Sequence, residues 1–291
     1  MDNMFTHIMI KHFRTQSGKK CCMRYLKLLI IVFFAIPILS LAQNHERPVA
    51  ISACKILEKK SHNPKSFTQG FVMDTEYFYE SSGHYSASFL ARYLIEANKS
   101  TNSDEQEKNM RLPNDIFAEG LTLLNDNLFL ITWKKGIAYQ LDKKTLTPIK
   151  TFRYSGEGWG LTHNTRSLIM SDGSHTLRYF NPNTFQLEKT LSINNAGKPL
   201  NNINELEFHD GIIWANKWYS DTIYGIEEES GHVIITINCK NLRSKSGVDL
   251  NKKEHVFNGI AYDPVKKGLW VTGKYWHSRF LIEIPALIQH H

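Results

Sequence analysis

The chain has 291 residues, of which 42% are hydrophobic, and a formal net charge of +7. This length allows one large domain or two small ones. No charge block or Pro/Gly-rich linker divides the chain after residue 45, so the composition speaks against two domains and favours one.

The first 42 residues have the order of segments that is typical of a secretory signal. Met23-Arg-Tyr-Leu-Lys27 is a short basic start, and an apolar run from Leu28 to Leu39 follows it. Ser40-Leu-Ala42 places small residues at the two positions that a signal peptidase reads. The run is short for a membrane span, which needs about 20 residues, although a retained N-terminal anchor is the alternative. We expect residues 1–42 to be an upstream extension and signal peptide, with Met23 as the start and the protein exported to the periplasm or secreted.

Removal of this leader changes the charge of the protein. Residues 1–42 contain six Lys/Arg and one Asp, so the mature chain falls from +7 to +2. The basic character therefore belongs to the leader and is no evidence for a nucleic-acid partner or a membrane surface. We expect neither partner, apart from the membrane contact of the signal peptide itself. Cleavage after Ala42 would expose Gln43 as the new N-terminus.

Two cysteines, Cys54 and Cys239, remain after the leader is removed. They lack the spacing of a zinc site. In an oxidising compartment they can pair as a disulfide, and two buried free thiols are the other interpretation.

Residues 43–63 are expected to join the body of the protein as an N-terminal segment, and short alternating strands follow from there. The predicted strands are Phe71–Glu80, Leu121–Trp133, Ile137–Asp142, Leu168–Asp172, Thr176–Asn181, Ile212–Asn216, Thr222–Glu227, Val233–Asn238 and Leu269–Gly273. The polar stretch Glu96–Asp115 is predicted to be a solvated loop. No segment predicts an amphipathic helix longer than two turns, so the fold class is all-β.

A repeat underlies these strands. Five segments begin with a polar or aromatic residue, then a small or polar residue, then a strand; they are Gln69-Gly-Phe71, Glu119-Gly-Leu121, Trp159-Gly-Leu161, Asn204-Glu-Leu206 and Asn258-Gly-Ile260. Their middle residues are separated by 50, 40, 45 and 54 positions. A period of this length made of strands alone predicts four-stranded propeller blades. We therefore expect residues 64–291 to form a five-bladed β-propeller; a large sandwich or barrel is the alternative.

Blade geometry predicts where chemistry would occur. The innermost strand of every blade lines the central channel, so the residues that begin the five repeats should converge there. Glu119 would be the one carboxylate at this point of the channel. The other four residues that begin the repeats are Gln69, Trp159, Asn204 and Asn258. Partial desolvation raises the pKa of a buried carboxyl toward neutrality, which suits it to proton transfer. The alternative is that these groups only hydrogen-bond one another or water in the channel.

At these positions the sequence resembles a known family, the glutaminyl-peptide cyclotransferases of the papaya and bacterial type. The motifs that carry the likeness are Phe67-Thr-Gln-Gly70, Tyr79-Glu-Ser-Ser-Gly83, Glu119-Gly-Leu-Thr122, Trp159-Gly-Leu161, Ser171-Asp-Gly173, Asn204-Glu-Leu-Glu207, Trp214-Ala-Asn-Lys-Trp218, Asn258-Gly-Ile-Ala261 and Val271-Thr-Gly-Lys-Tyr-Trp276. Each motif alone is weak, but the ordered series spans residues 64 to 284. The resemblance implies a five-bladed propeller and an intramolecular acyl transfer without a catalytic metal. The expected substrates are peptides or proteins that begin with glutamine.

The resemblance also implies roles for eight residues. Glu119 would shuttle the proton, and Lys274 would polarise a carbonyl or donate to an oxyanion. Trp133, Trp159 and Trp218 would wall the glutamine and exclude water, while Phe67, Gln69 and Asn204 would orient its amide and amine. The alternatives are packing between blades for Trp133 and Trp218, and a solvated rim charge for Lys274. Glu80 and Asn258 are expected to be structural.

Two other functions remain open from the sequence. A metal-dependent propeller lactonase would need oxygen ligands, which Glu119, Asn204 and Asn258 can supply. A non-enzymatic propeller would bind a peptide or a sugar on one face. For the cyclotransferase we expect no cofactor in catalysis, with a structural divalent ion left open, and we expect a monomer.

Overall fold

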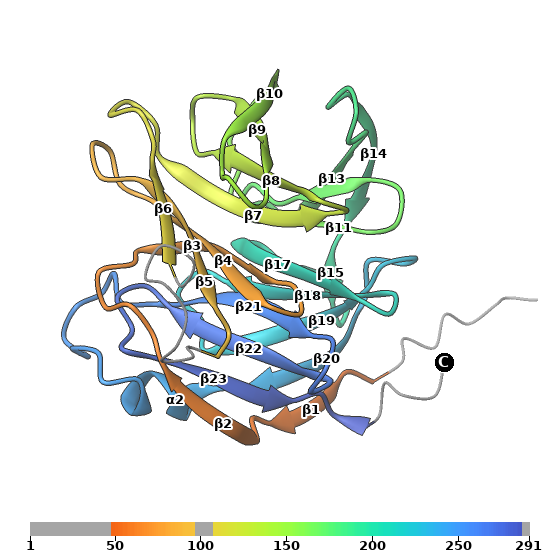
Figure 1. The fold of residues 1–291 in the computed structure, drawn as a ribbon. Helices are drawn as coiled ribbons and strands as arrows, with labels where there is room; N and C mark the ends of the chain where they lie inside the picture. The colour runs from red at the N-terminus through yellow and green to blue at the C-terminus, as the bar shows by residue number, and fades with distance from the viewer. Residues whose placement is uncertain (1–47, 97–106, 287–291) are drawn as a thin grey trace, which may run out of the picture. The chain divides into compact units, whose positions relative to one another are not determined.

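The computed structural model describes residues 48–96 and 107–286. The described residues belong to one compact unit, drawn as a ribbon in Figure 1. The predicted extension and signal peptide, with Met23 and Gln43, lie outside the described residues. Within the described ranges no helix has the length and apolar content that crossing a membrane requires.

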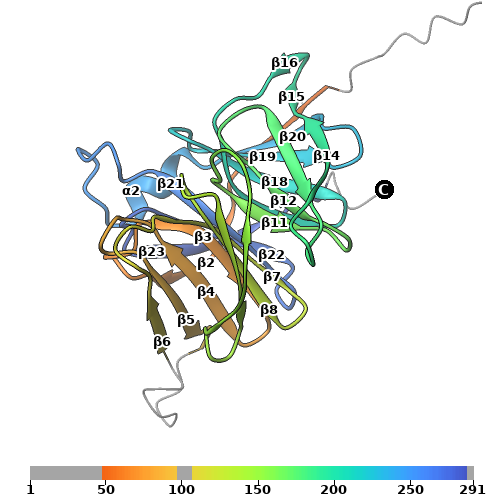
Figure 2. The same ribbon diagram turned by 90° about the horizontal axis from the view of Figure 1, so that it is seen from above.

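Five sheets, each built mainly from antiparallel strands that follow one another in the chain, form the blades, as predicted. The first two blades are β3 (Thr68–Met73), β4 (Tyr77–Ser82), β5 (Phe89–Leu94) and β6 (Glu107–Arg111), then β7 (Ala118–Leu124), β8 (Asn127–Thr132), β9 (Ile137–Asp142) and β10 (Pro148–Arg153). The third blade is β11 (Leu161–His163), β12 (Leu168–Met170), β13 (Thr176–Phe180) and β14 (Leu187–Ser192). Figure 2 shows the strands of the first blade side by side, from β3 to β6.

The last two blades complete the propeller. They contain β17 (Ile203–His209), β18 (Ile212–Lys217), β19 (Thr222–Glu227) and β20 (Val233–Asn238), then β21 (Phe257–Asp263), β22 (Gly268–Gly273) and β23 (Ser278–Glu283). A small hairpin of β15 (Asn194–Asn195) and β16 (Lys198–Pro199) precedes the fourth blade, and α2 (Lys240–Lys245) follows it. The sandwich and the barrel are therefore wrong, and the five-bladed propeller is confirmed.

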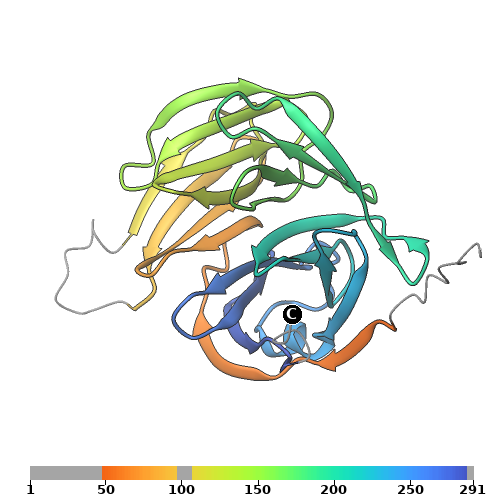
Figure 3. The same ribbon diagram turned by 90° about the vertical axis from the view of Figure 1, so that its right-hand side faces the viewer.

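The N-terminal strands close the ring. β2 (Ile56–Ser61) pairs antiparallel with β23 as the outer strand of the fifth blade. β1 (Ala50–Ala53) adds a parallel strand to β20 at the outer edge of the fourth blade. Figure 3 shows these orange strands beside the blue C-terminal ones. The segment predicted to join the propeller thus contributes strands to two blades.

Apolar residues fill the spaces between neighbouring blades. Each of the five core clusters draws its buried side chains from two adjacent blades. Between the fifth and first blades, for example, Trp270 packs with Phe71 and Phe78. Because both faces of an inner strand are covered in this way, these strands are buried along most of their length.

Glycine in the repeat lets the inner strands approach one another closely. A Cβ atom on Gly120 would lie 2.3 Å from the Leu161 backbone nitrogen, and one on Gly160 would lie 2.0 Å from the Asn204 carbonyl oxygen. Neither contact is sterically possible without a backbone shift. The middle residue of the repeat is therefore glycine where the next inner strand passes directly over it.

The fourth repeat has Glu205 in place of this glycine. Its fully buried carboxyl accepts the backbone N–H of Phe71 at 3.2 Å and that of Ile260 at 2.9 Å. Glu205 therefore joins the inner strand of the fourth blade to those of the first and fifth. Burial, together with neighbouring Glu207, raises the pKa of Glu205 well above its usual value.

Some details differ from the sequence-based predictions. Phe71–Glu80 and Leu121–Trp133 were each predicted as one strand, but each contains a tight turn and contributes to two strands. The stretch Glu96–Asp115 is not all loop, because β6 occupies part of it; residues 97–106 lie outside the described residues. Cys54 and Cys239 lie next to each other as free thiols.

The close approach at Gly160 gives a test of the fold. We expect Gly160→Ala to lower the free energy of unfolding by about 3 kcal/mol, because the added methyl overlaps a backbone atom that cannot move independently. Urea unfolding measures this loss. Gly211→Ala is the control, since its Cβ meets open space and only the positive φ of +75° opposes it, at about 1–2 kcal/mol. Equal losses in the two variants would contradict this account.

Candidate active site

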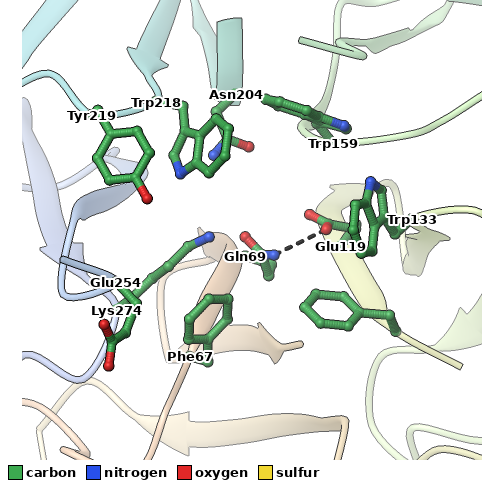
Figure 4. A pocket seen from close by; sticks show the side chains of 11 residues that line it. Phe67, Gln69, Glu119, Trp133, Trp159, Asn204, Trp218, Tyr219, Glu254 and Lys274 are labelled. Carbon is green, nitrogen blue, oxygen red and sulfur yellow. Dashed lines mark hydrogen bonds between the residues drawn. The ribbon is translucent and has the colours of Figure 1, made fainter. Parts of the chain in front are cut away.

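A pocket of about 190 Å³ opens where the inner strands begin. It is lined by Phe67, Gln69, Phe117, Glu119, Trp133, Trp159, Asn204, Trp218, Tyr219, Glu254 and Lys274. Sites for drug-sized ligands are larger, at roughly 300–1,000 Å³. The pocket therefore suits a single amino-acid side chain. Figure 4 shows the side chains of Gln69, Glu119 and Lys274 directed into the same space.

Two positions of the blade supply most of these residues. Gln69, Glu119, Trp159 and Asn204 belong to the start of an inner strand, whereas Trp133, Trp218 and Lys274 directly follow the second strand of their blade. Antiparallel pairing brings the end of the second strand beside the start of the first. The backbone N–H of Trp133 accordingly donates to Phe117 O, that of Trp218 to Asn202 O and that of Lys274 to Val256 O.

All eight residues predicted from the sequence line this one pocket. Asn258 does not line it; its side-chain amide donates to the backbone oxygens of Thr68 and Gln69. Glu80 is buried away from the pocket, where it accepts hydrogen bonds from Thr68 and Tyr93 and pairs with His62 at 3.0 Å. Its pKa is lowered, because these partners together outweigh the effect of burial.

Three lining residues were missed from the sequence: Phe117, Tyr219 and Glu254. Phe117 precedes Glu119 by two positions, as Phe67 precedes Gln69, so the repeat itself contained a signal for it. Tyr219 follows Trp218 directly and has a positive φ of 60°, a backbone conformation that the sequence does not indicate. Glu254 comes from the loop after α2 and has no counterpart in the other repeats.

Glu119 is the buried carboxyl of the pocket, with 5% of its surface exposed. Gln69 Nε2 donates to Glu119 Oε1 at 2.9 Å (Figure 4). Burial raises the pKa of Glu119 well above its usual value, Lys274 opposes the rise and the negative charge of Glu157 adds to it. The raised pKa makes the carboxyl a better proton acceptor than an ordinary glutamate, which suits it to proton transfer.

Lys274 is the buried cation of the same pocket. Its Nζ lies 4.2 Å from the centre of the Phe67 ring, a cation–π contact. Burial lowers the pKa of Lys274 to about 8, although the negative charge of Glu119 counteracts part of this effect. At neutral pH the group is mostly protonated, so it can donate a hydrogen bond to an oxygen in the pocket.

Polar oxygens and aromatic walls complete the pocket. Gln69 Oε1 and Asn204 Oδ1 are buried, and neither has a hydrogen-bond partner within the described structure. Such oxygens can accept hydrogen bonds from an amine or an amide that enters. The Trp159 and Trp218 rings meet edge to face at 5.6 Å, and Phe117 contacts Trp133 at 5.5 Å.

No group of three or more His, Cys, Asp and Glu side chains able to hold a metal ion occurs among the described residues.

The chain is similar to known proteins over most of its length. The family model described as glutamine cyclotransferase matches residues 29–284. The chain is 32% identical over 240 residues to the Arabidopsis thaliana glutaminyl-peptide cyclotransferase, covering 80% of this chain and 72% of the relative. A crystal structure of Myxococcus xanthus glutaminyl cyclase superposes with a TM-score of 0.73 at 31% identity, covering 81% of this chain and 98% of the other.

The opposed charges of the pocket lead to a prediction. We expect Lys274→Met to raise the pKa of Glu119 further, because the substitution removes the cation that favours the carboxylate. A carbon NMR titration of the glutamate carboxyls measures the shift, and the signal lost in Glu119→Gln identifies the residue. Lys253→Met removes a lysine that does not line this pocket and should leave the titration unchanged. A fall in the Glu119 pKa upon Lys274→Met would contradict the electrostatics described.

Proposed function

Since this chain belongs to the glutamine cyclotransferase family, we propose that its pocket converts the N-terminal glutamine of peptides and proteins into pyroglutamate and releases ammonia. The observation that carries the proposal is a buried carboxyl of raised pKa that shares the pocket with a buried ammonium and three indole rings. Family membership supports the transferase activity, and the geometry supports the division of labour that follows.

The reaction needs one proton to move. The free α-amine attacks the carbon of its own γ-carboxamide, and a C–N bond forms as the carbonyl π-electrons move onto oxygen. Glu119, ionised at that moment, takes a proton from the attacking nitrogen and returns it to the amide nitrogen. That nitrogen leaves as ammonia, the carbonyl re-forms, and the carboxylate is regenerated. No water is consumed, so atoms balance between glutamine, lactam and ammonia.

The other residues would supply charge stabilisation and orientation. Lys274 would donate to the oxyanion, and the unpartnered oxygens of Gln69 and Asn204 would bind N–H groups of the substrate. Phe67 and the three tryptophans would hold the glutamine side chain folded toward the ring. Orientation of this kind can lower a cyclisation barrier by several kcal/mol. The same walls would exclude water, whose attack would give glutamate instead.

We further propose that catalysis needs no metal ion and that the protein works outside the cytoplasm as a monomer.

The segments that support export lie outside the described residues, so export and cleavage of the leader are tested by mass spectrometry. If cleavage occurs after Ala42, mass spectrometry of the exported protein should find pyroglutamate at position 43. An intact glutamine there, or retained leader residues, would contradict this proposal.

The central test removes the carboxylate while keeping its shape. We expect Glu119→Gln to lower the rate of ammonia release from a Gln-initiated peptide by about 10²- to 10⁴-fold, because the proton has no acceptor. The control is Glu207→Gln, which removes a partly buried carboxyl that does not line the pocket and whose pKa desolvation raises to about 8. Full activity of Glu119→Gln would refute the mechanism. Loss of wild-type activity in a strong chelator would instead favour a metal-dependent enzyme.

The pH dependence of kcat/KM should be bell-shaped. Activity requires Glu119 deprotonated and the attacking α-amine uncharged, so it rises through an acidic limb to which both groups contribute. The contribution of Glu119 has an apparent pKa above the usual 4.5 of a glutamate. It also requires Lys274 protonated, so it falls through an alkaline limb near pH 8. Initial rates across pH on one peptide measure both limbs. An acidic limb at or below 4.5 would exclude Glu119 as the base.

A further inference from the structure

We infer that Glu157, which does not line the pocket, is a positioning residue that fixes two of its walls. The inference rests on the proposed function for its catalytic consequence. The Trp133 indole Nε1 donates to Glu157 Oε2 at 2.8 Å, and the Trp159 indole Nε1 donates to the same oxygen at 3.0 Å. Trp133 follows β8 of the second blade, and Trp159 precedes β11 of the third. One carboxylate oxygen therefore links indole walls from two blades.

The carboxylate is held in its charged form. Lys134 Nζ lies 3.7 Å from Glu157 Oε1 and 4.0 Å from the centre of the Trp133 ring, so it contacts both members of the bridge. Partial burial alone would raise the pKa of Glu157, but the hydrogen bonds from Trp159 and Trp133 and the charge of Lys134 lower it below its usual value. Hydrogen bonds to an ionised acceptor are stronger than neutral ones.

The backbone of the loop that carries Glu157 is also fixed. Arg178 of β13 donates to the Ser155 carbonyl at 2.6 Å and to the Glu157 carbonyl. The Gly158 N–H donates to Trp133 O at 3.1 Å, which ties the loop to the wall itself. The Glu157 side chain is 39% exposed, yet its position is determined by groups from two blades. It is therefore not an ordinary solvated surface charge.

Glu157 also acts on the catalytic carboxyl through its charge. Burial has the largest influence on Glu119, Lys274 favours its ionised form and Glu157 disfavours it. Tyr154, whose hydroxyl bonds to the Thr132 backbone, is a further titratable group near Glu119. Removal of the Glu157 charge should therefore shift the acidic limb of the pH profile to lower pH, opposite to the effect of removing Lys274.

Two variants separate geometry from charge. Glu157→Ala removes both the acceptor and the charge, and we expect kcat to fall about 10²-fold, as for a misplaced substrate-orienting group. Glu157→Gln keeps an acceptor oxygen and should restore most of kcat. Both variants lack the charge, so both should show the acidic limb at lower pH. In Glu157→Gln, kcat should thus recover while the acidic limb stays at lower pH. A residue with a purely structural role would not give this combination.

A second measurement needs no substrate. The protein has six tryptophans, so an ¹⁵N–¹H spectrum resolves at most six indole signals. Glu157→Ala should move those of Trp133 and Trp159, which Trp133→Phe and Trp159→Phe identify. Glu188→Gln is the matched control, because it removes a carboxylate on β14 of the third blade that accepts hydrogen bonds from Ser167 and Asn181 and does not line the pocket. It should change neither the spectrum nor kcat.

The outcomes are distinguishable from failure of the proposed function. If the wild type forms no pyroglutamate, the reaction is wrong, while the indole spectrum still tests the bridge. If the wild type is active and Glu157→Ala retains its kcat within twofold, the positioning role is wrong. Unmoved indole signals in Glu157→Ala would show that the bridge does not exist in solution. An unshifted acidic limb in both variants would remove the electrostatic part of the inference.

Discussion

The closure of five inner strands around one axis is the constraint on which the site depends. Contacts run in a ring from β3 to β7, β11, β17, β21 and back to β3. The ring can be this tight because the middle residue of the repeat lacks a side chain where the next strand crosses it, as at Gly120 and Gly160. Closure brings together residues that are more than 200 positions apart in sequence, such as Phe67 and Lys274. Loss of the ring would leave the pocket without opposite walls.

The ring also explains why two charged groups behave unusually. Glu119 and Lys274 are each 5% exposed, and burial shifts their pKa values in opposite directions, that of the acid upward and that of the amine downward. The positive charge of Lys274 offsets part of the effect of burial on Glu119, and the negative charge of Glu119 offsets part of the effect of burial on Lys274. A pair whose pKa values are moved toward neutrality from both sides is suited to acid–base chemistry at ordinary pH. The fold provides this property by excluding water rather than by any unusual side chain.

Much of this was predictable from the sequence, for physical reasons. Strand period and repeat length specify blades, and blade geometry makes Gln69, Glu119, Trp159 and Asn204 converge. The family resemblance added Phe67, Trp133, Trp218 and Lys274, which the pattern alone did not single out. Glu254 and Tyr219 were not predictable, because loop conformation places them. Glu157 was missed because its role is to accept hydrogen bonds from two indoles, and no spacing of residues in the sequence indicates such a contact.

The pairing of β2 with β23 has a consequence for how the molecule is made. The outer strand of the fifth blade, β2, is synthesised before the first four blades, and its partner β23 is synthesised after them. Contacts between such distant segments form slowly, because the entropy cost of closing a long loop comes before any stabilising contact between them. β2 therefore stays without its partner until β23 has emerged from the ribosome. The ring of blades therefore cannot close until the last blade has been made.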